Sequence, residues 1–290
     1  MYSASGKLML FGEYLVLKGA DCLAFPLKFG QELTISDSDV LTWESYAKHG
    51  MWFHVSMDNE LNIIETNDTK VAEILKNLLL VIRSEKPSLN LIHRFKAEAN
   101  FELNWGLGSS STLISLLSQW SGVDANTLLK DSFGGSGYDV ACATAKDAII
   151  YANGQTKKEI HLPTSITDNM LFIYLGQKQN SREEIKRFNA AEVTPADVET
   201  INSIVETSIK TNDIQVFENQ LNASENIVSR IIGSDKLKDR LFSDYEYSIK
   251  SLGAWGGDFF LATCRDIEKA KTYFSTKGYE TMFTYKELIK

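Results

Sequence analysis

The sequence has few cysteines, no excess of positive charge and no long run of apolar residues. Its 290 residues include three cysteines, Cys22, Cys142 and Cys264, which lie far apart and show no CxxC spacing. A disulfide framework or a cysteine-rich zinc site is therefore not expected. Acidic residues outnumber basic ones by 38 to 30, which gives a formal charge of −8. Nucleic-acid-binding proteins are usually basic, so we expect no nucleic-acid partner.

Segments that would direct a chain to a membrane are also missing from the sequence. The apolar stretch at 7–17, KLMLFGEYLVL, is interrupted by Glu13 and is too short for the apolar core of a signal peptide. No run approaches the roughly 20 apolar residues of a membrane-spanning helix. The sequence thus predicts a cytoplasmic protein without a membrane partner, and it leaves a homodimer open.

The chain is long enough for two domains. Strand-forming segments dominate the first part, and apolar residues at helical spacing predict an amphipathic helix near 69–86. A second alternation of strands and helices begins near residue 160. We therefore expect an N-terminal domain at 1–160 and a C-terminal domain at 161–290. Two helices of the second domain are predicted near 196–211 and 213–232.

A glycine- and serine-rich stretch stands directly before a predicted helix in the middle of the chain. Its sequence is NWGLGSSS, at residues 104–111. Apolar residues recur at i, i+3, i+4 and i+7 after it, so a helix is predicted to begin near Ser110 or Ser111. These apolar residues are Leu113, Leu116, Leu117 and Trp120.

Two interpretations of this stretch are open on the residues alone. Gly106 and Gly108 permit positive φ and a close approach of the backbone, so N–H groups at the helix start could bind phosphate. Alternatively, the serines at 109–111 only cap the helix. The motifs GxxxxGK[ST] and GxGxxG are both absent from the sequence. Their absence excludes a P-loop and gives no support to a dinucleotide-binding fold.

Three motifs, taken together, resemble those of the GHMP kinase superfamily. They are SGKLMLFGEYLVLKG at 5–19, GLGSSS at 106–111 and GAWGGDFFLA at 253–262. A fourth segment, GSGYDVACATA at 135–145, resembles the part that supplies the catalytic aspartate in mevalonate-type members. The GEY, GSGYDVA and GGD sequences are most similar to those of the phosphomevalonate kinases, with the mevalonate kinases next.

The resemblance implies a two-domain α/β (α+β) fold with the active site in the cleft between the domains. The N-terminal domain would be like ribosomal protein S5 and the C-terminal domain ferredoxin-like. The implied reaction uses ATP and Mg²⁺ to phosphorylate a hydroxyl or phosphate of a mevalonate-pathway intermediate, phosphomevalonate or mevalonate. A lyase like diphosphomevalonate decarboxylase and a non-catalytic nucleotide- or metabolite-binding protein are the alternatives. The acceptor itself is not given by the sequence.

The resemblance also implies roles for individual residues. Lys7 would stabilise negative charge on the acceptor and the transferred phosphate, and Asp139 would accept or orient the acceptor's proton. Ser110 would ligate Mg²⁺. The residues implied to hold the ATP phosphates are Gly106, Leu107, Gly108, Ser109, Ser110, Ser111, Gly256 and Gly257. Those implied on the substrate side are Glu13, Tyr14, Gly137, Ser181 and Arg182.

Each of three charged residues also has a simpler explanation. Lys7 could extend from a strand edge into solvent. Asp139 could be a turn residue or a helix N-cap after Gly137. Glu13 could pair structurally with a neighbour.

The sequence departs from the family pattern in three places. FELNW precedes the second motif where a proline and a further glycine are usual. Trp255 stands where the third motif usually has glycine. Leu128 occupies the place of the Mg²⁺-binding glutamate of mevalonate kinases, and Asp131 is the acidic residue that could substitute for it.

Overall fold

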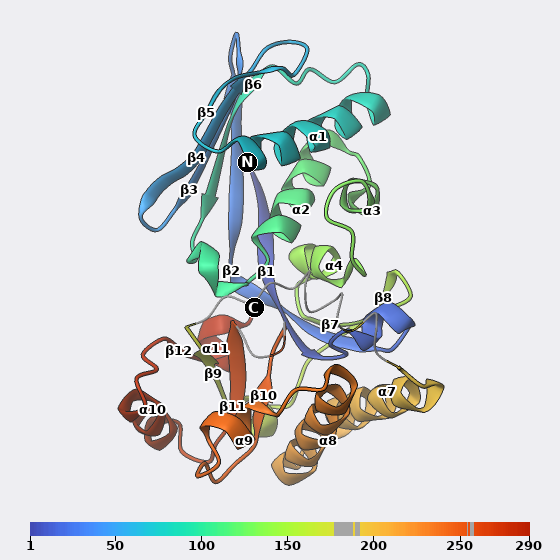
Figure 1. The fold of residues 1–290 in the computed structure, drawn as a ribbon, viewed down its shortest axis with the longest axis vertical. Coiled ribbons are helices and arrows are strands. Elements are labelled where there is room, and N and C mark those ends of the chain that lie inside the picture. Colours follow the sequence, from blue (N-terminus) through green and yellow to red (C-terminus); the bar gives the residue numbers. More distant parts are fainter. Residues whose placement is uncertain (177–187, 189–191, 254, 256–257) are drawn as a thin grey trace. The chain divides into compact units, whose positions relative to one another are not determined.

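The computed structural model forms two compact units (Figure 1). It describes residues 1–176, 188, 192–253, 255 and 258–290. Unit 1 comprises Met1–Gly6, Phe29–Leu103 and Leu107–Thr144, and unit 2 comprises Lys7–Lys28, Asn104–Gly106 and Ala145–Lys290. Two long paired strands, β1 (Tyr2–Phe11) and β2 (Cys22–Asp37), run through both units. The division into domains at 1–160 and 161–290 stays a prediction.

Unit 1 contains a mixed sheet with the strand order β5-β4-β3-β6-β2. Its remaining strands are β3 (Leu41–Ala47), β4 (Gly50–Met57), β5 (Ile63–Thr66) and β6 (His93–Ala99). All neighbours are antiparallel except β3 and β6, which pair in parallel. Parallel neighbours need a long crossover connection, and α1 (Thr69–Glu85) lies in it. This helix confirms the prediction for 69–86.

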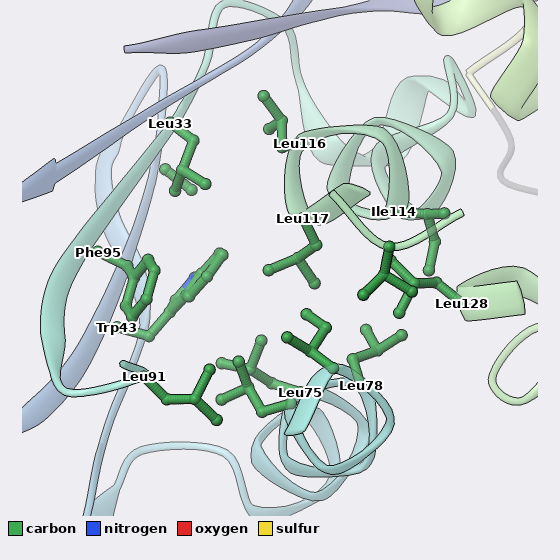
Figure 2. Packing of buried hydrophobic residues seen from close by; sticks show 14 of the residues in the cluster. Leu33, Trp43, Leu75, Leu78, Leu91, Phe95, Ile114, Leu116, Leu117 and Leu128 are labelled. Carbon is green, nitrogen blue, oxygen red and sulfur yellow. The ribbon is translucent and has the colours of Figure 1, made fainter. Parts of the chain in front are cut away.

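The helices of unit 1 cover one face of this sheet. After α1 come α2 (Ser109–Ser121), α3 (Ala125–Lys130) and α4 (Tyr138–Thr144). The short 3₁₀ helix η2 (Leu103–Trp105) begins in unit 1, and its last two residues belong to unit 2. Figure 2 shows strand side chains such as Trp43 and Phe95 pointing toward Leu75 of α1 and Leu117 of α2. Each of these side chains is at most 2% exposed. Full burial of one such side chain stabilises the fold by about 1.5–3 kcal/mol, so this cluster fixes α2 against the sheet.

Unit 2 contains the strands β7 (Ala148–Ala152) and β8 (Gln155–Ile160), in the order β2-β7-β8, and a separate four-stranded sheet. That sheet has the order β10-β11-β9-β12 and only antiparallel neighbours. Its strands are β9 (Met170–Tyr174), β10 (Ile249–Ser251), β11 (Phe259–Thr263) and β12 (Met282–Thr284).

The four-stranded sheet has ferredoxin-like topology. Along the chain, helices separate β9 from β10, β10 and β11 follow one another, and a further helix separates β11 from β12, so the third strand pairs with both the first and the second. The helices of unit 2 are η1 (Leu15–Lys18), α5 (Thr164–Thr167), α7 (Pro195–Lys210), α8 (Ile214–Ile232), α9 (Leu237–Leu241), α10 (Ile267–Thr276) and α11 (Tyr285–Leu288). Helices α7 and α8 confirm the two helices predicted for this part of the chain.

Local sequence signals explain where these helices begin. Asp68 caps α1 by accepting hydrogen bonds from the N–H groups of Lys70 and Val71. At α7, Thr194 and Asp197 form a reciprocal capping box, and Pro195 follows at the first helical position. Among the described residues, no helix is long and apolar enough to cross a membrane.

Candidate active site

The residue that caps the start of helix α2 is a glycine and not a serine. Gly108 is its N-cap residue, in the left-handed conformation with φ of 99°, and no side chain makes a capping hydrogen bond. The Ser111 hydroxyl instead donates to the Gly108 carbonyl at 2.9 Å. The serines therefore do not cap α2, and the N–H groups of its first turn carry the partial positive charge of an uncapped helix end.

The side chains around this helix start differ in exposure. Ser110 is exposed and Ser109 half-buried, whereas Ser111 and Leu107 are each 1% exposed. Ser111 and Leu107 can thus offer a ligand only their backbone groups. Ser110 presents its hydroxyl to solvent, as a group that contacts phosphate or a metal ion must.

Asp139 lies in the first turn of α4, which packs against α2 within unit 1. One of its carboxylate oxygens accepts a hydrogen bond from the N–H of Val140 at 3.0 Å. A carboxylate at this place is stabilised by the helix dipole. Gly137 precedes the helix with φ of 88° and is buried. Asp139 and the serines thus lie on neighbouring helices of one unit.

Leu128, which stands at the position of the Mg²⁺-binding glutamate of mevalonate kinases, is a core residue. Leu128 in α3 is fully buried and packs in the core of unit 1. Asp131, the substitute considered from the sequence, is exposed at the C-terminal end of α3. Within the described ranges, no group of three or more His, Cys, Asp or Glu side chains is placed to hold a metal ion.

Lys7 is held by the glycine loop in unit 2. Its ammonium donates a hydrogen bond to the Gly106 carbonyl at 3.0 Å, so the side chain does not simply extend into solvent. Gly106 has φ of 69°, and a Cβ placed on it would lie 2.0 Å from a carboxylate oxygen of Asp258. A side chain at this position would be strained by the positive φ and would displace the Asp258 carboxylate, which favours the glycine found there. Lys7 and Asp139 belong to different units.

Glu13 forms a buried ion pair with a residue that the sequence did not single out. Lys250 of β10 donates to one Glu13 carboxylate oxygen, and its Nζ lies 3.4 Å from an oxygen of Glu225 in α8. All three side chains are at most 2% exposed. Burial raises the pKa of Glu13 above its ordinary value and that of Glu225 to about 7. The structure thus shows the pairing of Glu13 with a neighbour; its contact with substrate stays a prediction.

Tyr14, the other substrate-side residue of the first motif, is buried and has φ of 59°. Its hydroxyl accepts a hydrogen bond from the backbone N–H of Trp255 at 2.9 Å, and its ring stacks on Phe188 at a centroid separation of 5.4 Å. Trp255 itself is 4% exposed. The first motif is therefore joined to the third motif within unit 2.

Four of the predicted site residues lie outside the described residues: Gly256, Gly257, Ser181 and Arg182. Sequence reasoning missed Lys250 and Glu225, and no local motif marks either. It also missed Trp105, which directly precedes Gly106, and Tyr174, which contacts Trp105 and Asn104 in unit 2. For Trp105, its place directly before the glycine loop could have marked it as a residue that contacts the site.

The chain has the fold of the GHMP kinases, as its motifs predicted. No protein-family model and no curated protein sequence matches it. A Streptococcus pneumoniae phosphomevalonate kinase, solved with phosphomevalonate and AMPPNP, aligns with a TM-score of 0.76 and 15% identity over 98% of this chain and 99% of that one.

Two further solved structures have the same fold. Mevalonate kinase of Methanococcus jannaschii gives a TM-score of 0.71 and 16% identity, over 97% of this chain and 96% of that chain. Galactokinase of Lactococcus lactis gives 0.71 and 12%, over 97% and 92%. The fold is therefore shared by enzymes that are named for different acceptors, so the fold alone does not identify the acceptor of this protein.

Proposed function

We propose that this protein is an ATP- and Mg²⁺-dependent small-molecule kinase. It transfers the γ-phosphate to an oxygen of a mevalonate-pathway intermediate, phosphomevalonate or mevalonate. The observation that carries the proposal is the uncapped, glycine-led start of α2 in a chain with the GHMP kinase fold. The phosphomevalonate kinase of this fold that was solved with phosphomevalonate and AMPPNP supports the choice of substrates.

The start of α2 suits a polyphosphate for two physical reasons. Its first-turn N–H groups have no side-chain cap, and the helix dipole places about half a positive charge there. Gly108, in the left-handed conformation, lets an anion approach the backbone closely. Ser109 and Ser110 add hydroxyl groups beside these N–H groups. ATP phosphates would bind at this helix end.

The residues present also fit Mg²⁺ that is bound together with the nucleotide. Mg²⁺ usually keeps several waters and takes one or two protein ligands along with substrate phosphates. The exposed Ser110 hydroxyl would be one such ligand, and Asp139, on the helix α4 that packs against α2, is an acidic candidate in unit 1. When bound, the ion would neutralise charge on the phosphate oxygens.

Phosphoryl transfer requires the protein to position the acceptor oxygen against the γ-phosphorus and to stabilise the negative charge on the transferred phosphate. The acceptor oxygen forms a bond to the γ-phosphorus as the bond from that phosphorus to the ADP oxygen breaks. Lys7 stabilises the negative charge that develops on the transferred group. A hydroxyl acceptor passes its proton to Asp139, late in the transfer because an ordinary Asp has a pKa of about 3.9. A phosphate acceptor, with a second pKa of about 6, has little need of a base at neutral pH.

An ADP-release screen tests the proposal. Purified protein is assayed with Mg²⁺-ATP and, one at a time, mevalonate, phosphomevalonate, homoserine and galactose. In a parallel reaction with ATP and diphosphomevalonate, CO₂ release is measured. We expect ADP release that depends on mevalonate or phosphomevalonate, with a phosphorylated product and no CO₂. Release of CO₂ from diphosphomevalonate would identify the lyase instead. ATP binding without turnover of any acceptor would identify a non-catalytic protein.

A further inference from the structure

Each of the three residues that precede Leu107 (Asn104, Trp105 and Gly106) makes its own contact within unit 2. The Tyr174 hydroxyl donates a hydrogen bond to the Asn104 carbonyl at 3.1 Å. The Gly106 carbonyl accepts the hydrogen bond of the Lys7 ammonium at 3.0 Å. The segment that holds Lys7 is thus itself fixed through its backbone.

The side chain in the middle of this segment anchors it to the four-stranded sheet. Three aromatic rings surround Trp105, with centroids 6.2 Å (Tyr174), 6.1 Å (Phe259) and 5.5 Å (Phe283) from its own. They come from the three adjacent strands β9, β11 and β12. Aromatic pairs at these separations attract one another beyond the burial of their surfaces. The Trp105 ring therefore restrains the backbone of the glycine that follows it.

A carboxylate completes the environment of this glycine. The carboxylate of Asp258 occupies the space that a Cβ of Gly106 would need, so it packs against the backbone of this glycine. Burial and the charge of Asp258 raise the pKa of Tyr174 above its ordinary value. A tyrosine hydroxyl is already protonated at neutral pH, and the raised pKa extends to higher pH the range over which Tyr174 can donate to Asn104.

Restraint of this kind matters for a lysine in particular. A lysine ammonium sits on a flexible four-carbon stem with many rotamers, so an unrestrained ammonium samples many positions. A misplacement of about 1 Å at a reacting centre can cost about a hundredfold in rate. A carbonyl acceptor whose backbone is held by these contacts restrains the ammonium before substrate binds.

We propose that Tyr174 and Trp105 are positioning residues: they fix the Gly106 carbonyl, and this carbonyl sets the place of the Lys7 ammonium for phosphoryl transfer. The catalytic part of this inference rests on the proposed function, in which Lys7 stabilises charge on the transferred phosphate. It also gives a physical reason for the tryptophan that stands before the glycine loop, where the family pattern has a proline and a glycine instead.

Chemical labelling tests the placement of Lys7 without any substrate. Competitive acetylation with acetic anhydride, followed by mass spectrometry, gives the reactivity of each lysine in the whole protein. Tyr174→Phe removes one hydroxyl and should raise the acetylation rate of Lys7 at least threefold, relative to the exposed Lys210 as internal reference. The matched control is Tyr245→Phe, because Tyr245 also donates to a backbone carbonyl in unit 2, at 2.8 Å. Equal Lys7 reactivity in both variants would overturn the proposal.

A double-mutant cycle then tests whether the placement matters for catalysis. Tyr174→Phe should lower kcat about tenfold with little change in KM, and less than twofold when Lys7→Met is already present. Equal losses in both backgrounds would mean that Tyr174 does not act through Lys7, which overturns the inference. If Lys7→Met alone leaves kcat unchanged, the role of Lys7 in the proposed function fails, whatever the labelling shows.

Discussion

The three serines at the start of α2 differ in what their surroundings leave them to do. Ser111 is buried and uses its hydroxyl within the helix, whereas Ser110 is exposed and has a hydroxyl that can contact a ligand. The residues alone did not separate capping from anion binding, because a serine beside a glycine can do either with the same atoms, and only the family resemblance singled out Ser110. Only the backbone conformation of Gly108 separates the two uses.

This difference predicts opposite effects of two alanine substitutions. Ser110→Ala should lower kcat strongly, most of all at low Mg²⁺, and leave the melting temperature unchanged because Ser110 caps nothing. Ser111→Ala should cost about 1 kcal/mol of stability, from the lost hydrogen bond to Gly108, with little effect on kcat. Steady-state ADP release and thermal unfolding of both variants check this. A Ser110→Ala protein as active as the unaltered one at low Mg²⁺ would remove the metal role.

The contribution of Asp139 to kcat should be larger for a hydroxyl acceptor, which must lose a proton, than for a phosphate acceptor, which is already ionised. Asp139→Asn keeps the shape of the side chain and removes its charge. With mevalonate as acceptor, kcat should fall by about 100-fold or more. With phosphomevalonate the loss should be smaller, and Lys7→Met should cost more than Asp139→Asn. The check is kcat for both variants with both acceptors; full activity of Asp139→Asn with every acceptor would leave Asp139 only its structural place in the first turn of α4.

At the scale of elements, one buried cluster joins the turn after β1 to β10 and α8. Glu13, Lys250 and Glu225 meet there without exposure to solvent. Glu225 also accepts hydrogen bonds from the N–H and hydroxyl of Ser251. Two carboxylates share one ammonium in this low-dielectric interior, so Glu225 retains a proton to a higher pH than an exposed carboxyl does.

This cluster predicts a pH dependence of stability with a definite sign. The pKa of Glu225 is raised from an unfolded value of 4.5 to about 7 in the fold. The folded state thus binds more protons than the unfolded state across this interval, and the stability that Glu225 contributes is lost as the pH rises from 4.5 through 7. Burial raises the pKa of Glu13 in the same direction, while the two carboxylates raise that of Lys250 and keep it charged throughout.

Glu225→Gln isolates this effect, because the amide keeps the size of the side chain and cannot ionise. Denaturant unfolding of the Gln variant should lose less stability between pH 5 and 8 than the unaltered protein does. Glu199→Gln, an exposed change in α7, is the control and should follow the unaltered protein. Identical pH profiles for all three proteins would show that Glu225 is ionised at the same pH folded and unfolded.

At the scale of the whole molecule, the sequence motifs predicted the overall fold, whereas the spacing of apolar residues predicted only individual helices. Helical spacing placed α1, α7 and α8, and the three motifs predicted the GHMP kinase fold. Strand order could not be derived, because β3 pairs with β6 across a connection that no local signal describes. The pairing of Glu13 with Lys250 joins residues 237 apart in the chain, so it depends on tertiary structure alone.

The central claim is that the start of α2 binds the phosphates of ATP, and calorimetric titration with Mg²⁺-AMPPNP tests it most directly. Ser109→Asp places a negative charge in the first turn of the helix, where the dipole stabilises it, and Ser109→Asn is the neutral match. We predict that the Asp variant melts no lower than the Asn variant but binds the nucleotide at least about tenfold more weakly, since its charge repels phosphate. Equal affinities of the two variants would contradict phosphate binding at this helix end.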